Sequence, residues 1–226
     1  MRRAIAIVDY GAGNLTSVRK SFAAAGGTVF VPAVPADLED VLAVVVPGVG
    51  HFGSTVALDG AWRAAIGGAI RRGMPLLGIC LGLQWLFEAS SEAPGVDGLG
   101  VLEGRCERLT GGVKVPHVGW NTLDVRRASR LLTGVPNGSH AYFTHAYAAP
   151  VTSECVAVAT HGVTFAAAIE RGSVFGVQFH PEKSGPAGLR ILANFVALAN
   201  ERLLPPGTGT GFDRAGKAPE RQAGAG

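Results

Sequence analysis

A cysteine stands between two glycines in the segment GICLGLQ, residues 78–84. Glycines two places before and after Cys80 are what a sharp strand-to-helix turn requires, as in the G-x-S-x-G nucleophile elbow with sulfur in place of oxygen. Free backbone N–H groups at a helix start favour a thiolate, and the amide of Leu81 is placed to hold a developing oxyanion. The alternative is a small buried cysteine at a tight turn. The spacing favours Cys80 as a nucleophile.

A thiol nucleophile needs a base, and His180 has the most suitable neighbours of the six histidines. It ends the apolar run VFGVQF and is followed by Pro181 and Glu182. Side chains at i and i+2 of an extended chain project to the same side, and proline biases the preceding residue towards extended geometry. Glu182 is therefore expected to orient the His180 ring, although a chance H-P-E in a turn is the alternative. His145, among aromatic neighbours in YFTHAY, is instead expected to be a core histidine.

Length, charge and composition limit the classes of protein to which the chain can belong. A chain of 226 residues suits one α/β domain that buries roughly 70% of its extended-chain surface. The net charge is +3 and no Lys/Arg run is longer than two, so the sequence shows no basic segment of the kind that binds nucleic acid. The N-terminal apolar run meets Asp9 after five residues, too soon for a signal peptide or a membrane span. Three cysteines without metal-ligand spacing predict a reduced, cytoplasmic setting without a structural metal. No cofactor is expected.

Hydrophobic patterning predicts the elements that position these residues. In the first half, short β-branched runs alternate with helical patterns, which is typical of a mostly parallel sheet covered on both faces. The expected strands there are 4–8, 28–31, 41–46 and 76–79, and the expected helices are 14–25, 59–72 and 81–90. From about residue 98 the pattern changes to strands at 99–104, 113–125, 140–147, 155–160, 163–169 and 173–179, closed by a helix at 186–203.

Two glycine-bearing segments are not expected to bind nucleotides. The turn DYGAGN (9–14) has Thr16 where a dinucleotide fingerprint requires its third glycine. The Pro/Gly/Ala-rich segment 205–226 has Phe212 as its only large apolar residue, so it is expected to be a disordered tail. Residues 1–204 are then one domain.

The motifs resemble a known family. GICLGLQ, followed 100 positions later by FHPE, resembles the class I (triad-type) glutamine amidotransferases. Further segments resemble one branch of that family, the glutaminase subunits of imidazole glycerol phosphate synthases: DYGAGN, PGVGHFG (47–53), VPHVGWN (115–121), YFTHAY (142–147) and FHPEKS (179–184). The likeness covers about residues 4–203. It implies a single-domain, flavodoxin-like α/β amidotransferase fold over residues 1–204.

The resemblance implies hydrolysis of glutamine through a γ-glutamyl thioester, with release of ammonia. Cys80 is then the nucleophile, His180 the general base and later acid, and Glu182 the group that orients His180. It also implies an oxyanion strand, on which the N–H of Val49 must turn inward to join that of Leu81. The family pattern implies that the Val49 amide is turned away until the partner and its ligand are bound.

Glutamine contacts are implied on both sides of the nucleophile. Gln84, Glu88 and Glu92 are spaced by four, so they share one face if the helix runs that far. The resemblance favours Gln84 and Glu92 as substrate contacts, with Glu88 a solvated charge. The other implied contacts are Gly48, Gly50, Thr144, His145, Ala146 and Tyr147.

The family branch implies a partner, a (β/α)₈-barrel cyclase that forms a heterodimer with the glutaminase and receives its ammonia. Asn14, Trp120 and Lys183 resemble residues at that contact. Three other functions are considered: another class I amidotransferase feeding a different synthase, a catalytically silent interaction module, and a stand-alone cysteine hydrolase or peptidase. PGVGHFG and VPHVGWN count against the first, and the intact Cys80, His180 and Glu182 count against the second.

Overall fold

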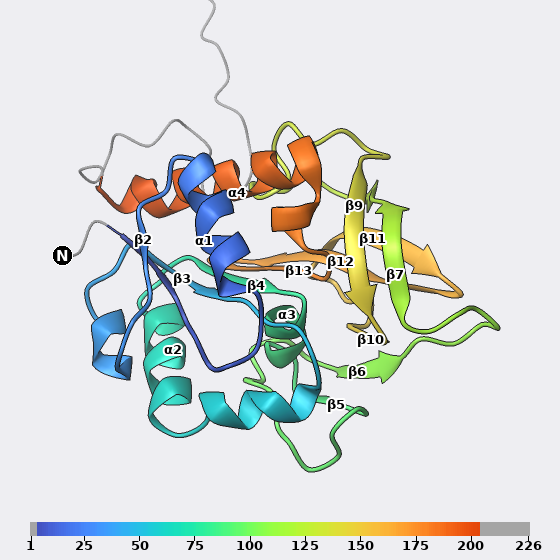
Figure 1. Ribbon diagram of the computed structural model, residues 1–226, viewed down its shortest axis with the longest axis horizontal. Coiled ribbons are helices and arrows are strands. Elements are labelled where there is room, and N and C mark those ends of the chain that lie inside the picture. The colour runs from blue at the N-terminus through green and yellow to red at the C-terminus, as the bar shows by residue number, and fades with distance from the viewer. Residues whose placement is uncertain (1–3, 204–226) are drawn as a thin grey trace, which may run out of the picture.

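A central eight-stranded sheet with helices on both faces forms the body of the protein, seen in a computed structural model that describes residues 4–203 (Figure 1). The predicted fold class is confirmed, whereas the predicted tail at 205–226 lies outside the described residues. The strands lie in the order β2 (Val29–Phe30), β1 (Ile5–Ile7), β3 (Ala43–Val46), β4 (Leu76–Ile79), β13 (Val174–Val177), β12 (Val163–Arg171), β11 (Cys155–His161) and β8 (Asp124–Val125).

The sheet has a parallel half and an antiparallel half. Strands β2, β1, β3, β4 and β13 pair in parallel, while β12, β11 and β8 continue the sheet antiparallel. All four residues of β3, β4 and β13 are buried, which explains their near-continuous apolar sequences. Two smaller sheets complete the fold: β10 (Tyr147–Ala148), β6 (Arg105–Arg108) and β5 (Ala89–Ser90); and the antiparallel pair β7 (His117–Thr122) and β9 (His140–His145).

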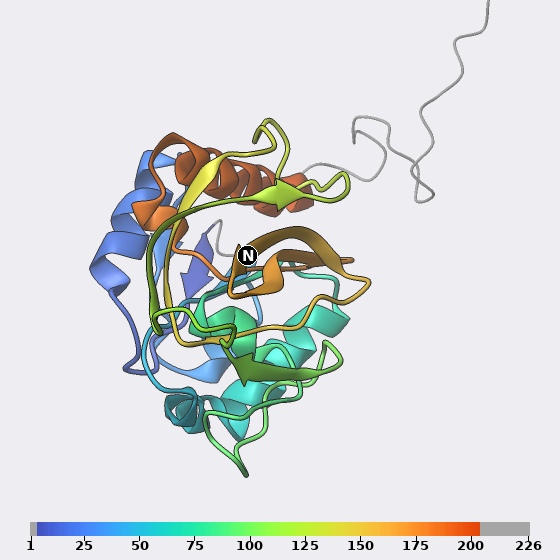
Figure 2. The same cartoon turned by 90° about the vertical axis from the view of Figure 1, so that its right-hand side faces the viewer.

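Helices cover the two faces of the sheet in pairs (Figures 1 and 2). On one face, α1 (Leu15–Ala24) contacts α4 (Gly185–Asn200), where the rings of Phe22 and Phe195 meet edge to face with centroids 6.2 Å apart. Side chains of α2 (Ala61–Arg71) and α3 (Leu81–Trp85) join the core of the opposite face. No helix among residues 4–203 is long and apolar enough to cross a bilayer.

The second half of the elbow helix differs from the sequence prediction. The helix expected at 81–90 ends at Trp85, and the strand expected at 99–104 is a loop that closes the helix. Loop amides satisfy the free carbonyls: Leu102 N–H donates to Leu86 at 3.0 Å, and Gly98 N–H donates to Glu88 at 2.7 Å. The expected helix 59–72 likewise begins later, at Ala61, after a 3₁₀ segment Phe52–Leu58.

Candidate active site

Cys80 lies on the predicted strand-to-helix elbow, between β4 and α3. Its backbone has φ 53° and ψ −105°, and it is the one non-glycine residue between 4 and 203 with a positive φ. Such a conformation is strained for a residue with a Cβ, and strain of this kind clusters at functional sites. The N–H of Cys80 donates to Val177 of β13 at 2.7 Å, which fixes the elbow to the neighbouring strand.

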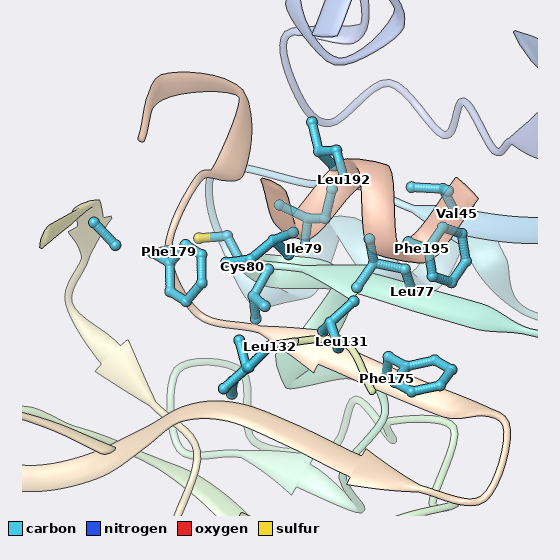
Figure 3. Close-up of a cluster of buried hydrophobic side chains, with 14 of the residues drawn as sticks. Val45, Leu77, Ile79, Cys80, Leu131, Leu132, Phe175, Phe179, Leu192 and Phe195 are labelled. Carbon is cyan, nitrogen blue, oxygen red and sulfur yellow. The ribbon is translucent and has the colours of Figure 1, made fainter. Parts of the chain in front are cut away.

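Close backbone contacts explain the two glycines that flank the nucleophile. A Cβ on Gly82 would lie 1.8 Å from the carbonyl oxygen of Val46 in β3, and one on Gly78 would lie 2.7 Å from the oxygen of Gly82. Neither position can hold a larger residue without moving the backbone. Cys80 belongs to the same buried apolar cluster as Phe179 (Figure 3), and the residue is only 4% exposed.

His180 and Glu182 form a buried pair at the start of the turn that follows β13. His180 Nδ1 lies 2.8 Å from Glu182 Oε1, with side chains 5% and 3% exposed. The backbone holds this loop in place, because His180 N–H donates to Tyr142 of β9 at 2.9 Å. His180 Nε2 is buried without a well-formed hydrogen bond among the described residues, and its interaction is with the Cys80 side chain, so this nitrogen is placed to exchange a proton with the thiol. The predicted contact is present, but a 3₁₀ turn at Pro181–Lys183 makes it, since only His180 itself is extended as the i, i+2 argument assumed.

The charge state of His180 depends on its two neighbours. Burial lowers the pKa of His180, but interactions with Cys80 and then Glu182 outweigh burial and raise this pKa to about 10. A protonated imidazole stabilises a thiolate beside it. The structure therefore places a protonated imidazole, oriented by a carboxylate, beside the Cys80 sulfur.

Gln178 is a neighbour of the nucleophile that the sequence analysis missed. Its Nε2 lies 3.6 Å from the Cys80 sulfur, and its Oε1 accepts a hydrogen bond from Gln84 Nε2 at 3.2 Å. Gln84 Nε2 also donates to the Tyr147 carbonyl at 2.7 Å. Gln84, expected as a substrate contact, thus links the elbow helix to β10 through its buried side-chain amide. The i, i+2 rule applied backwards from His180 would have indicated Gln178.

The predicted oxyanion donors are not both free in this conformation. The N–H of Leu81 donates to the carbonyl oxygen of Gly48 at 3.3 Å. The peptide that joins Gly48 to Val49 therefore directs its oxygen, not its N–H, at the Leu81 amide. Val49 is 40% exposed, and its neighbour Gly50 has φ 115°.

The two acidic residues that were predicted on one helix face contact different loops. Glu92 Oε2 accepts the N–H of Phe52 at 2.8 Å, which places this carboxylate beside the loop that follows Gly50. Glu88 Oε2 instead accepts the N–H of Gly104 at 2.9 Å. Gln84, Glu88 and Glu92 could share a helix face only if the helix reached Glu92, and it ends at Trp85.

His145 is buried in β9 as a hydrogen-bonded core histidine. Its Nδ1 lies 2.9 Å from the Tyr147 carbonyl and must carry the proton, so Nε2 accepts from His117 Nδ1 at 3.3 Å. Burial lowers the pKa of His145 to about 3; burial and then His161 lower the pKa of His117 to about 4. Two neutral rings thus brace β9 behind Thr144, whose carbonyl lies 3.9 Å from the Cys80 sulfur.

A known protein family matches most of this chain and agrees with the geometry of the site. The family model described as Glutamine amidotransferase class-I matches residues 6–199. The chain belongs to the class-I glutamine amidotransferase family. It is 46% identical over 200 residues to the imidazole glycerol phosphate synthase subunit HisH of Moorella thermoacetica, covering 87% of this chain and 95% of that relative. It is 47% identical over 195 residues to the subunit of the same name from Methanothermobacter thermautotrophicus, covering 86% and 98%.

Solved structures of amidotransferases share the fold. A glutamine amidotransferase crystal structure superposes with a TM-score of 0.68 at 22% identity, covering 86% of this chain and 98% of that one. The structure of PurLQS from Thermotoga maritima gives 0.68 at 19% identity, covering 90% and 100%. At these identities the likeness shows the shared architecture.

An aromatic and basic surface of this class-I glutamine amidotransferase lies next to the His180 loop. Trp120 is 57% exposed and meets the ring of Tyr142 edge-on at 6.0 Å, while Lys183 Nζ lies 5.6 Å from the same ring. Asn14, the third predicted interface residue, caps α1 by accepting the N–H of Ser17 at 3.1 Å. Among residues 4–203, no group of three or more His, Cys, Asp or Glu side chains is placed to hold a metal ion.

Proposed function

We propose that this chain is the glutaminase subunit of an imidazole glycerol phosphate synthase. The observation that carries the proposal is the elbow at Cys80, whose side chain interacts with the buried His180–Glu182 pair, in a chain 46% identical to a HisH subunit. Among class I amidotransferases, that relationship selects the synthase branch over one that feeds another enzyme. A stand-alone hydrolase would need an oxyanion site that is open without a partner, whereas here the Leu81 amide is occupied.

The proposed reaction uses Cys80 and His180 in two halves. The thiolate of Cys80 attacks the side-chain amide carbon of glutamine, and the C–N bond breaks as His180 protonates the leaving nitrogen. Ammonia departs, leaving a γ-glutamyl thioester. His180 then takes a proton from water, which attacks the thioester and releases glutamate. Glu182 holds the ring through Nδ1, so that Nε2 carries the proton in transit.

Negative charge on the substrate oxygen needs donors in both halves. We assign these to the N–H groups of Leu81 and Val49, which become available together when the Gly48–Val49 peptide rotates. Each such donor is worth about 10²–10³ in turnover. The conformation seen here is then the resting one, and the lone chain binds glutamine but hydrolyses it slowly.

The proposed partner is a (β/α)₈-barrel cyclase that receives the ammonia directly and forms a heterodimer with this chain. Free ammonia protonates at neutral pH and ceases to be a nucleophile, which favours direct transfer. The exposed Trp120, with Lys183 and Asn14, supplies an anchor of the kind that interfaces use. A cytoplasmic location fits three free cysteines among the described residues, since the Cys80 thiol must stay reduced.

The test is synthesis by the reconstituted complex with two nitrogen sources. Cys80→Ser is expected to abolish glutamine-dependent formation of the imidazole product while leaving synthesis from ammonium salts intact, because the cyclase chemistry lies on the other subunit. Loss of both activities in a well-assembled complex would contradict the assignment of Cys80. Capture of a different synthase, with no activation by the cyclase, would instead point to another amidotransferase.

A further inference from the structure

Tyr10 has a buried hydroxyl with no hydrogen-bond partner among the described residues. The residue follows β1 in the turn DYGAGN, and its ring packs against the apolar cluster of Phe52, Leu81 and Ala93. Leaving a buried hydroxyl unpaired is unfavourable, and each such group in a folded protein calls for an explanation. Burial, and next the charge of Cys80, raise the pKa of Tyr10, so this hydroxyl remains protonated and able to donate.

The hydroxyl lies against Gly48, the residue whose carbonyl occupies the Leu81 amide. A Cβ built on Gly48 would be 2.0 Å from Tyr10 Oη and 2.9 Å from Leu81 Cβ. The tyrosine therefore excludes any side chain at position 48. It also puts an unused proton donor beside the peptide that must rotate in the proposed mechanism.

Rotation of the Gly48–Val49 peptide changes which groups are paired. In the present conformation the Gly48 oxygen accepts from Leu81 N–H, and the Tyr10 hydroxyl has no partner. After rotation the Leu81 and Val49 amides serve the oxyanion, and the Gly48 oxygen loses its donor. Gly13, which borders this peptide on another side, has no side chain to offer: a Cβ there would lie 3.8 Å from Val49 N.

We infer that Tyr10 is a positioning residue for glutamine hydrolysis, whose hydroxyl donates to the carbonyl of Gly48 once that peptide has rotated. The inference rests on the proposed function and extends it to a residue outside the triad. Each orientation of the peptide then leaves different groups unpaired: the Tyr10 hydroxyl in the resting form, and the two oxyanion amides in the active form before substrate arrives. The hydroxyl lowers the free energy of the active orientation alone.

Tyr10→Phe tests the inference, because it removes one hydroxyl and keeps the ring. The ratio of cyclase-stimulated to lone-chain glutaminase turnover should fall about tenfold, the value of one hydrogen bond to a carbonyl that is otherwise unpaired. The melting temperature of the lone chain should stay the same or rise, since the hydroxyl is unpaired in the resting form. The KM for glutamine and the rate of Cys80 alkylation by iodoacetamide should stay within twofold.

Two outcomes would overturn the inference. One is an unchanged stimulation ratio in Tyr10→Phe. The other is a lower melting temperature with equal losses of stimulated and lone-chain turnover, which would show a purely structural hydroxyl.

A readout independent of the cyclase separates this inference from the proposed function. Alkylation of wild-type Cys80 with a chloroketone analogue of glutamine places a carbonyl oxygen in the oxyanion site. The crystal structure of that adduct should show Tyr10 Oη within about 3.2 Å of the Gly48 oxygen. A rotated peptide whose oxygen bonds elsewhere contradicts the role of Tyr10, as does an adduct with the peptide unrotated. Wild-type chain that no cyclase stimulates contradicts the proposed function alone.

Discussion

The N–H of Leu81 and the carbonyl oxygen of Gly48 are joined by a hydrogen bond of 3.3 Å. This bond occupies the N–H of Leu81, the residue that follows Cys80. Its acceptor belongs to the Gly48–Val49 peptide, whose N–H is the second expected oxyanion donor. Rotation of one peptide would free Leu81 and present Val49 in the same step. In the proposed mechanism both donors would then be gained or lost together, which would make this peptide an effective point of control.

Val49→Pro should lower cyclase-stimulated glutaminase turnover while leaving the alkylation of Cys80 unchanged. Proline has no N–H, so the variant lacks one oxyanion donor while Cys80, His180 and Glu182 remain in place. We expect cyclase-stimulated glutaminase turnover to fall by about 10²–10³. Iodoacetamide, which needs no oxyanion site, should still alkylate Cys80 at close to the wild-type rate.

The matched control is Val49→Ala, which keeps the amide and removes most of the half-exposed side chain. It should retain stimulated turnover to within a few-fold. Full stimulation of Val49→Pro in a folded chain would show that the second donor is another group. Equal losses in both variants would point instead to a side-chain contact with the partner.

Glu182→Gln should change the titration of His180 without touching Cys80. The carboxylate is one of the groups that raise the pKa of His180 to about 10, so its loss lowers the pH at which the ring gives up its proton. Because the protonated ring is the acid that serves the leaving nitrogen, we expect the alkaline limb of the glutaminase pH–rate profile of the cyclase complex to move to lower pH by about one unit. Glu88→Gln, which alters a carboxylate that accepts from the Gly104 amide, should keep the wild-type profile. Coincident profiles in all three proteins would remove Glu182 from the charge balance of the site.

Local rules predicted the parts of the site that depend on neighbouring residues. The elbow follows from glycines two places either side of Cys80, and the His180–Glu182 contact is made within three residues by the 3₁₀ turn that Pro181 begins. Both patterns are decided within five residues, so tertiary structure had little room to override them. The parallel half of the sheet was equally evident, because strands buried on both faces are apolar throughout.

Contacts between distant segments could not be predicted from the sequence. The elbow helix stops at Trp85 because a loop from residues 98–104 supplies its capping amides, and the helical pattern up to residue 90 carries no sign of that loop. The bond between Leu81 and Gly48 and the unpaired hydroxyl of Tyr10 join segments that are more than thirty positions apart. Their arrangement depends on how β1, β3 and β4 bring three turns to one end of the sheet.

Gly82→Ala should show how tightly the elbow is packed. The new methyl would lie 1.8 Å from the Val46 oxygen in β3, a backbone atom that cannot swing aside. We expect a loss of at least about 3 kcal/mol in the free energy of urea unfolding, or failure to fold. Gly67→Ala, in α2, is the control: its nearest neighbour is the flexible end of Arg71 at 3.4 Å, and it should gain about 0.5–1 kcal/mol. Comparable stabilities for the two variants would mean that the elbow can relax.

His145 should make the stability of the chain depend on pH between about pH 6.5 and about pH 3. Its pKa is about 3 in the folded state against about 6.5 unfolded, so below pH 6.5 the unfolded chain binds a proton that the folded chain refuses. The free energy of unfolding therefore falls as pH falls through this window. His145→Asn removes the titration and keeps an amide donor for Tyr147.

Between pH 7.5 and 4.5, wild type should lose up to about 2 kcal/mol more than His145→Asn, measured by urea unfolding. Comparing each protein with itself at pH 7.5 removes the constant loss of ring packing against Phe165, whose centroid lies 5.0 Å away. Parallel pH profiles for the two proteins would mean that the buried ring accepts its proton in the folded state. His145 would then not be the neutral brace behind the Thr144 carbonyl that the hydrogen bond to Tyr147 indicates.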